Sequence, residues 1–215
     1  SGIVASDCNM PDSPENNFAT LSPLDKHPTF PALTEGNLKT SNPASAWFFC
    51  RSTIGMTSGK WYAEIRVTGA YVQCQVMKQT ALLTQNSSAN ASGGYGFFLD
   101  NTDIKSYSNG TLGADVGDLT DGDIIGLAYD YDAGTCQIRQ NNTLRATTSS
   151  IPTTEAMTFM SATAEITNTT TWNFGQDSTF AGAITAGTET DGNGKGVFKY
   201  APPSGYLALC TANLP

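Results

Sequence analysis

Four aspartates that lie close together in the sequence are the first candidates for chemistry: Asp121, Asp123, Asp130 and Asp132. A pair of carboxylates flanking one bond is the machinery of a glycosidase, in which one group acts as the acid and the other as the base or nucleophile. Asp121 and Asp132, however, stand in glycine-containing turns, where an aspartate commonly accepts hydrogen bonds from its own backbone. For Asp130, which falls inside a predicted strand, we favour a hydrogen-bonded structural role over catalysis.

The histidine and the cysteines offer no better catalytic group. The single histidine, His27, lies in a proline-rich connection without a Gly-x-Ser-x-Gly motif elsewhere, so we predict a surface histidine. The cysteines are odd in number and widely spaced, and a zinc site would need closer ligands and a histidine partner. They are Cys8, Cys50, Cys74, Cys136 and Cys210. We therefore expect reduced, buried thiols, no catalytic residues and no enzymatic activity.

Two acidic, glycine-containing runs resemble parts of a calcium-binding loop: residues 130–134 (Asp-Tyr-Asp-Ala-Gly) and residues 191–195 (Asp-Gly-Asn-Gly-Lys). Neither run supplies the glutamate that closes such a loop, and a lysine stands where the second would need a further oxygen ligand. Turn formation explains both runs, because Asp, Asn and Gly all favour tight turns. We predict no metal site and no cofactor.

Binding residues can be nominated more readily than catalytic ones. Loops at one end of a β-sandwich can form a joint recognition surface on a rigid frame, and tyrosine suits such a surface because it combines apolar area with a hydroxyl group. We nominate Tyr71, Gln75, Tyr107 and Asn109 as ligand-binding residues that reach this surface. The alternative for each is an ordinary half-buried strand or turn residue. Residues 79–94, small and polar toward their end, are predicted to form a long exposed loop of the kind that often serves function.

The element expected to hold these side chains in place is a β-hairpin over residues 121–142. Its first arm, residues 124–131, is almost entirely apolar, as in a strand that is buried on both faces. Its second arm alternates, with Cys136 and Ile138 directed inward. Asx and Gly residues open, reverse and close the hairpin, since they tolerate the positive φ of such turns. This hairpin is predicted to be the centre of a β-sandwich core.

Other strands recur every 10 to 15 residues, with turns between them. Residues 60–67 alternate most cleanly, with Trp61 on the apolar face and Tyr62 and Glu64 on the polar face, which predicts a half-exposed antiparallel strand. Further strands are predicted at residues 46–52, 71–77, 95–99, 157–166, 170–174, 197–200 and 207–210, with a turn at 22–25 and a short hairpin around Ser108-Asn109-Gly110. The fold class is therefore all-β, an antiparallel sandwich with long surface loops.

Composition and charge exclude several classes of partner. The 215 residues carry a net charge of −8 and no Lys/Arg cluster, so nucleic acid should be repelled. No apolar run approaches the length of a membrane span, so we expect no membrane insertion. Gly, Pro, Thr, Ser and Asn are abundant and charged residues make up only 14%, a mixture that suits short strands joined by turns. We divide the chain into an N-terminal arm or linker, residues 1–17, and a single domain, residues 18–215.

Several runs, taken in order, resemble the SPRY (B30.2-like) domain. Residues 122–134 (Gly-Asp-Ile-Ile-Gly-Leu-Ala-Tyr-Asp-Tyr-Asp-Ala-Gly), followed by a strand that closes at Asn141-Asn142, are similar to that family's aspartate–aliphatic–glycine strand and its asparagine turn. Residues 51–64, 173–176 and 202–209 resemble its early glycine turn with an aromatic strand, its Asn-Phe-Gly element and its late proline–glycine–aromatic element. The resemblance covers most of the chain and implies a concanavalin-like jelly-roll sandwich.

The sequences of residues 16–25, 51–55 and 207–215 resemble SPRY modules embedded in the virion proteins of tailed bacteriophages, such as tail fibres, more than they resemble other SPRY domains. This resemblance implies a non-catalytic module for adhesion or virion assembly, located in the virion after assembly in the host cytoplasm. Its partners would be a host-surface glycan or protein, or neighbouring virion proteins, with a trimeric homo-oligomer as the expected assembly. Two alternatives stay open: a lectin-like domain that binds or acts on glycans, and a cellular SPRY module that binds a peptide.

Overall fold

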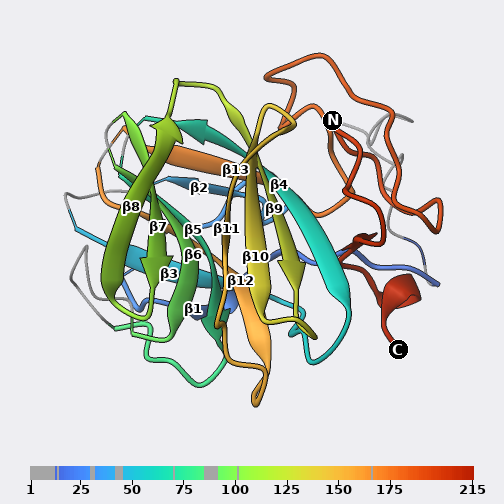
Figure 1. Cartoon of the computed structure of the whole chain (residues 1–215). Helices are drawn as coiled ribbons and strands as arrows, with labels where there is room; N and C mark the ends of the chain where they lie inside the picture. Colours follow the sequence, from blue (N-terminus) through green and yellow to red (C-terminus); the bar gives the residue numbers. More distant parts are fainter. Residues whose placement is uncertain are drawn as a thin grey trace.

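The computed structural model describes residues 13, 15–29, 32–41, 46–69, 71–84, 92–100, 102–165 and 167–215. These residues form two β-sheets packed face to face, with a 3-10 turn at Thr211–Asn213 (Figure 1). The predicted all-β sandwich is therefore confirmed. Most of the predicted N-terminal arm and residues 85–91 of the predicted long loop lie outside the described residues. No helix in the described part of the chain is long and apolar enough to cross a membrane.

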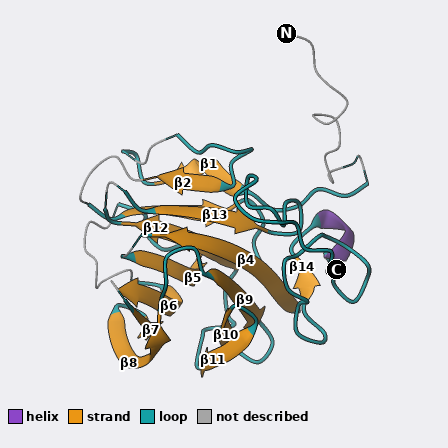
Figure 2. Ribbon diagram, turned by 90° about the horizontal axis from the view of Figure 1, so that it is seen from above, coloured by secondary structure: helices purple, strands orange, loops and turns teal. Residues whose placement is uncertain are grey.

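The strands of the first sheet follow the order β1-β3-β12-β5-β6-β7-β8. They are β1 (Leu21–Lys26), β3 (Phe48–Ser52), β12 (Met157–Thr163), β5 (Val72–Lys78), β6 (Gly94–Asp100), β7 (Asp103–Ser108) and β8 (Thr111–Asp118). The second sheet follows the order β11-β10-β9-β4-β13-β2, and β14 adds to β4 in parallel. Its strands are β11 (Thr143–Thr148), β10 (Thr135–Gln140), β9 (Ile124–Asp130), β4 (Lys60–Thr68), β13 (Thr169–Asn173), β2 (Lys39–Ser41) and β14 (Leu207–Ala208). Figure 2 shows that β8 and β11, the last strands of the two sheets, lie at the same edge of the sandwich.

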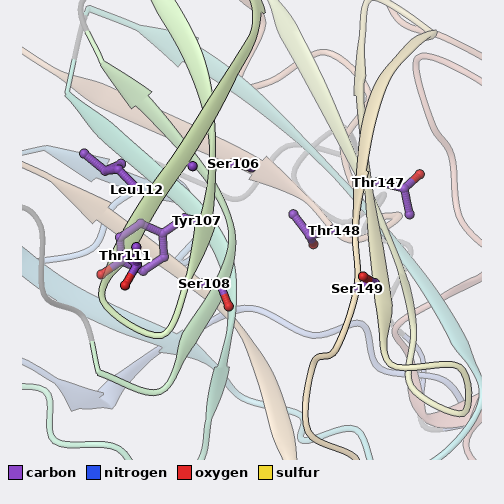
Figure 3. Close-up of a pocket in the computed structure, with 9 residues that line it drawn as sticks. Ser106, Tyr107, Ser108, Thr111, Leu112, Thr147, Thr148 and Ser149 are labelled. Carbon is purple, nitrogen blue, oxygen red and sulfur yellow. The ribbon is translucent and has the colours of Figure 1, made fainter.

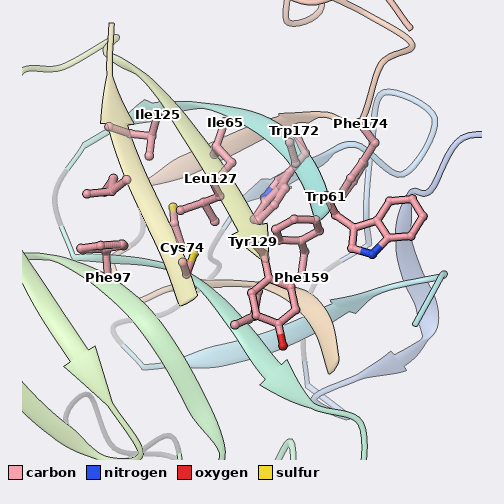
Figure 4. Packing of buried hydrophobic residues seen from close by; sticks show 14 of the residues in the cluster. Trp61, Ile65, Cys74, Phe97, Ile125, Leu127, Tyr129, Phe159, Trp172 and Phe174 are labelled. Carbon is pink, nitrogen blue, oxygen red and sulfur yellow. The ribbon is translucent and has the colours of Figure 1, made fainter. Parts of the chain in front are cut away.

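The main core fills the space between the two sheets. Because side chains alternate across a strand, each inner face contributes every second residue to it. Figure 4 shows this packing, in which Leu127 and Tyr129 of β9 and Ile65 of β4 meet Cys74 and Phe159 from the first sheet. All five side chains are fully buried. The inward position predicted for Trp61 of β4 is confirmed.

The hairpin predicted over residues 121–142 is also present. All of β9 is buried, and β10 alternates with Cys136 and Ile138 inward. The closing turn places Asn141 and Asn142 at positive φ (47° and 69°), and Gly134 has φ 62° in the reversing turn. Because β9 lies between β10 and β4 in the second sheet, this hairpin is an internal part of the frame.

The prediction that β4 is half-exposed is wrong. Tyr62 and Glu64, on the outer face of β4, are as buried as the residues on its inner face. The C-terminal segment, residues 174–215, covers them: the rings of Tyr62 and Phe198 lie 5.3 Å apart, edge to face. The Glu64 carboxylate accepts the backbone N–H groups of Lys199 (2.8 Å) and Tyr200 (2.7 Å). Alternation alone could not reveal this cover, because it comes from the other end of the chain.

Two local predictions also differ in part from the structure, and one strand was missed. Residues 22–25 fall within β1, whose register against β3 shifts between Leu21 and Lys26, and the Ser22 hydroxyl accepts the N–H groups of Leu24 (3.3 Å) and Asp25 (3.1 Å), so the predicted turn is an irregularity inside the strand. Residues 197–200 contribute only an isolated bridge between Glu189 and Phe198. The strand β11 was not predicted, although residues 143–148 follow directly after the Asn-Asn turn.

Candidate functional site

The turn between β7 and β8 stands at one end of the sandwich and consists of Asn109 and Gly110. Both residues adopt positive φ (46° and 90°), which these residue types tolerate, so the predicted short hairpin is confirmed. The Asn109 N–H donates to the Gly94 carbonyl oxygen (2.7 Å), and the Asn109 Oδ1 accepts the Gly93 N–H (2.8 Å). The turn is thereby fixed to the start of β6.

Between β8 and β11 lies a cleft of about 310 Å³, which we name the edge cleft. Figure 3 shows its two walls, with the β7–β8 hairpin on one side and the end of β11 on the other. The lining residues are Ser106, Tyr107, Ser108, Thr111, Leu112, Gly113, Thr147, Thr148 and Ser149. None of these lining residues is charged, and most carry an aliphatic hydroxyl group.

The edge cleft forms because the inner face of β7 changes character along the strand. Ile104 is fully buried in the core, whereas Ser106 and Ser108, the next residues on that face, carry hydroxyl groups. Gly113 allows β8 to approach closely, since a Cβ atom there would lie 2.2 Å from the Ser106 Oγ. Apolar packing therefore ends at Ile104, and a polar cleft begins beyond it.

A second hollow, of about 450 Å³, lies on the other side of the same turn, and we name it the outer hollow. It is lined by Lys78, Thr80, Ala81, Leu82, Ser92, Gly93 and Asn109, so it includes the described ends of the predicted loop at residues 79–94. Leu82 is 70% exposed beside it. The Lys78 ammonium pairs with Glu155 (2.8 Å), and this contact raises the pKa of Lys78. The turn at Asn109 therefore separates two concave surfaces of different chemistry.

The four nominated binding residues do not share one surface. Asn109 lines the outer hollow, and Tyr107 lines the edge cleft although its side chain is only 1% exposed. Gln75 is fully buried, and neither atom of its amide group has a hydrogen-bond partner among the described residues. The expectation that Gln75 and Tyr107 reach the surface is wrong, because the outer face of the first sheet carries a second apolar cluster that includes Phe98 and Met160.

Tyr71 lies at the opposite end of β5 from the Asn109 turn. It is 37% exposed and has φ 60°, an uncommon conformation for a bulky residue. Asn109 contacts Gly94, which pairs with Met77 near the far end of that strand. The two sites are roughly 20 Å apart along β5, given a rise of about 3.3 Å per residue. The nomination of Tyr71 and Asn109 as binding residues stays a prediction, but they cannot contact one small ligand together.

The aspartates at residues 121–132 accept hydrogen bonds from backbone N–H groups. Only Asp123 does so from its own turn. Asp121 and Asp132, for which the same was expected, instead accept from glycines that are distant in the sequence. The donors are Gly69 to Asp121 (2.7 Å), Thr120 to Asp123 (2.8 Å) and Gly59 to Asp132 (3.1 Å). Their carboxylate groups therefore stabilise the backbone around the hairpin.

Asp130 has the hydrogen-bonded role predicted for it. Its Oδ1 accepts the Ala133 N–H (3.0 Å), and its Oδ2 pairs with the Lys60 ammonium (2.9 Å). Burial acts to raise the pKa of Asp130, but the Lys60 ammonium and the backbone donors outweigh it and lower that pKa below its usual value. Asp130 is consequently ionised and paired at the end of β9, next to the turn.

The second calcium-like run is a turn that anchors the C-terminal segment. The Asp191 Oδ1 accepts the N–H groups of Asn193 (2.9 Å) and Lys195 (2.8 Å), and its Oδ2 accepts those of Ala208 (2.9 Å) and the Asn213 amide (2.7 Å). Both oxygens of Asp191 thus hold protein groups. No cluster of three or more His, Cys, Asp or Glu among the described residues could hold a metal ion.

His27 is buried, so the prediction of a surface histidine is wrong. Its ring lies 5.0 Å from that of Phe48, and its Nδ1 accepts the Thr29 N–H (3.2 Å). The backbone of His27 extends β1 along β3, where its N–H donates to the Phe49 carbonyl oxygen (2.8 Å). Proline-rich flanks suggested a surface connection, but pairing with β3 buries this one.

The four cysteines that the structure describes are free and buried, as predicted, and Cys8 lies outside the described residues. Burial raises the pKa of Cys50 and of Cys136 to about 12, and it also raises the pKa values of Cys74 and Cys210. A nucleophilic cysteine needs an accessible thiolate, which these environments disfavour. The thiols therefore act as small apolar core residues.

Sequence reasoning missed one wall of the edge cleft, because it did not identify β11. A signal was present: residues 143–148 read Thr-Leu-Arg-Ala-Thr-Thr directly after a two-residue Asn-Asn turn. Threonine favours strands, and a tight turn after one strand commonly introduces its antiparallel neighbour. Thr147, Thr148 and Ser149 of the cleft wall would have followed from that assignment.

No family model matches this sequence, and no curated protein matches it. Solved structures do match. The crystal structure of the PSpry domain of TRIM65 superposes with a TM-score of 0.59 at 13% identity, covering 73% of this chain and 92% of that one. The SPRY domain of human HERC1 gives a TM-score of 0.55 at 11% identity, covering 71% of this chain and 96% of that one. At these identities the similarity establishes the fold, so the chain has a SPRY-like β-sandwich.

Proposed function

We propose that this chain is a non-catalytic recognition module that binds a protein or peptide partner at the end of the sandwich around the β7–β8 turn. The observation that carries this proposal is the position of that turn. Asn109 and Gly110 form a ridge between the edge cleft and the outer hollow, and hydrogen bonds to Gly93 and Gly94 hold the ridge in place. A preorganised surface of this kind binds without the cost of ordering a loop.

The chemistry of the ionisable residues supports a role in binding over one in catalysis. The four aspartates of the β9–β10 region and Asp191 hold backbone N–H groups, and burial raises the thiol pKa values. The similarity to two SPRY structures adds support, because that fold presents loops on a rigid sandwich.

The setting in which the module works remains a separate proposal. One proposal is that the module belongs to a tail fibre or another virion protein, with a trimeric assembly and a host-surface or virion partner. This proposal rests on the sequence resemblance alone. A cellular SPRY module that binds a peptide fits the fold equally well. The identity of the genes that flank the coding sequence distinguishes the two: structural phage genes support the virion setting, and a neighbouring effector domain supports the cellular one.

A parallel binding screen tests the proposed function. The chain would be probed with a yeast-displayed library of random octapeptides and with a glycan array, each with and without calcium. We expect saturable peptide binding that is independent of calcium. Leu82→Arg places a bulky charge in the outer hollow, and Ser108→Arg places one at the mouth of the edge cleft. At least one of these two variants should weaken peptide binding by at least about tenfold, or about 1.4 kcal/mol. Leu24→Arg, at a residue that is 96% exposed on β1, is the matched control and should leave binding unchanged.

Two results would overturn this proposal. The first is binding to glycans in place of peptides. The second is turnover of a host polysaccharide that Asp130→Asn abolishes while the variant remains folded, because the Asp130 carboxylate would then be catalytic.

A further inference from the structure

We propose that the edge cleft is the site for an extended, uncharged peptide segment, which adds as a strand to the free edge of β11. This inference rests on the proposed function and makes it specific. The strand β11 pairs with β10 on one side, and no described strand pairs with its other edge, which faces the cleft. An unpaired edge presents a row of backbone N–H and C=O groups that an incoming strand can bond.

The β11 edge is a better template than the β8 edge across the cleft. The pairing of β10 with β11 shifts register once, between Leu144 and Ala146, and residues 146–148 then pair without interruption. The pairing of β7 with β8 shifts register twice, and Gly117 has φ 151°. Register shifts distort an edge and discourage strand addition. A peptide would therefore pair with β11 and contact β8 mainly through side chains.

The lining of the cleft indicates the chemistry of the segment. No residue in the described part of the chain forms a hydrogen bond with the hydroxyl groups of Ser106, Ser108, Thr111 or Ser149. A hydroxyl group both donates and accepts, so it complements peptide amides and small polar side chains. Because no charged residue lines the cleft, a buried ligand charge would remain unpaired at considerable cost. Sugar stacking would need an exposed ring face, and the one ring in the lining, Tyr107, is buried.

A tie between the two sheets closes the cleft at one end and limits the length of the segment. The buried Gln140 donates to the Asp118 carbonyl oxygen (2.7 Å), and its Oε1 accepts the Arg145 Nε–H (2.8 Å). Arg145 lies against Gly117, since a Cβ atom on that glycine would be 3.7 Å from the Arg145 Cδ. The open stretch beside the cleft thus runs from Ala146 of β11 to Ser149, which accommodates roughly four residues at about 3.3 Å each.

The decisive experiment compares two identical substitutions on one strand. Thr148→Trp fills the edge cleft, because Thr148 lies opposite the inward residue Cys136 and its side chain is directed toward the β7–β8 hairpin (Figure 3). Thr143→Trp places the same side chain on β11 beyond Arg145. Thr148 is half-buried and Thr143 is exposed, so circular dichroism and thermal melting would check that both variants fold. For peptides selected from the octapeptide library, we expect Thr148→Trp to weaken binding at least about tenfold and Thr143→Trp to change it less than about twofold. If Thr148→Trp does not fold, Ser149→Trp tests the same wall.

A scan of backbone N-methylation along one selected peptide separates strand addition from side-chain recognition. In an added strand, alternate N–H groups donate to the edge, so methylation should abolish binding at every second residue. Uniform tolerance of N-methyl groups would overturn the inference. Binding that survives Thr148→Trp but is lost in Leu82→Arg would also overturn it and would leave the proposed function intact, with the outer hollow as the site. Failure of all peptides, together with glycan binding, would overturn both.

Discussion

The β9–β10 and β7–β8 hairpins each carry an asparagine turn of almost the same chemistry but have different roles. Asn141-Asn142 follows the β9–β10 hairpin and leads from β10 into β11, whereas Asn109-Gly110 is the turn between β7 and β8, and all four residues have positive φ. The β9–β10 hairpin lies inside the second sheet, between β4 and β11, and β9 is buried throughout. The β7–β8 hairpin forms the edge of the first sheet, and most of β8 is exposed. The first hairpin is part of the frame, and the second presents a surface.

The difference shows that the local sequence determines the turn while the neighbouring strands determine its role. Asn141 donates to the buried Asp123 carboxylate (2.7 Å), so its side chain works inside the frame. Asn109 uses its side chain to hold Gly93, at the rim of a hollow. The same residue type therefore stabilises the frame at the end of the β9–β10 hairpin and a candidate binding ridge at the turn between β7 and β8.

The largest difference between the hairpins should appear in side-chain truncation. Tyr129→Ala removes a fully buried ring from β9 and should lower the free energy of unfolding by about 3–5 kcal/mol, through lost burial and the cavity that remains. Leu112→Ala in β8, at a residue that is 39% exposed, should lower it by less than about 1 kcal/mol. Urea unfolding of both variants measures the two values. Equal losses would show that the β7–β8 hairpin is as much a part of the frame as the β9–β10 hairpin.

Glu64, which lies opposite Gly126 of β9, provides the next largest effect and a pH dependence. Glu64→Gln places an amide N–H against the backbone donors of Lys199 and Tyr200 and should lower the free energy of unfolding by about 1–3 kcal/mol. Burial raises the pKa of Glu64 above its usual value of 4.5, against the opposing effect of these N–H donors. With a folded pKa above the unfolded one, the stability linked to protonation is fully present below pH 4.5 and is lost as the pH rises through the folded pKa.

The stability difference between wild type and Glu64→Gln should therefore shrink as the pH rises from 4 toward neutrality, in a series of urea titrations. The comparison with the variant cancels the contributions of the other carboxylates, which both proteins share. A difference that grows with pH would mean that the N–H donors outweigh burial and that the pKa of Glu64 is lowered.

Much of the frame could be predicted from the sequence, because alternation and turn residues are local signals. The β9–β10 hairpin, the inner face of β4 and the Asn109-Gly110 turn all followed from residues adjacent in the chain. The cover over Tyr62 and Glu64 could not be predicted, because the C-terminal segment that provides it is more than a hundred residues away. The binding site was predicted least well. Gln75 and Tyr107 were placed at the surface because each strand was assumed to have one buried face, whereas both faces of the first sheet are covered by apolar clusters.

The two asparagine turns offer a smaller test of the same contrast. Asn141→Ala removes an acceptor for the Ile124 N–H and a donor to Asp123, and it places alanine at positive φ. We expect a loss of about 1–2 kcal/mol in the free energy of unfolding. Asn109→Ala carries the same φ penalty but leaves only the partly exposed Gly93 N–H unpaired, so its loss should be about 1 kcal/mol. Thermal denaturation ranks the two, and a larger loss for Asn109→Ala would contradict the assignment of the frame to the β9–β10 hairpin.

The smallest expected effect concerns two tyrosines at the end of β9 whose rings meet edge to face, 6.1 Å apart. The Tyr131 hydroxyl donates to the carbonyl oxygens of Thr153 (2.7 Å) and Glu155 (3.1 Å), whereas the buried Tyr129 hydroxyl has no partner in the part of the chain that the structure describes. Tyr131→Phe should therefore lower the free energy of unfolding by about 1 kcal/mol, and Tyr129→Phe should leave it unchanged or raise it by up to about 1 kcal/mol. A loss above about 1 kcal/mol in Tyr129→Phe would mean that this hydroxyl is hydrogen-bonded in solution, and that the centre of the frame contains a polar contact of its own.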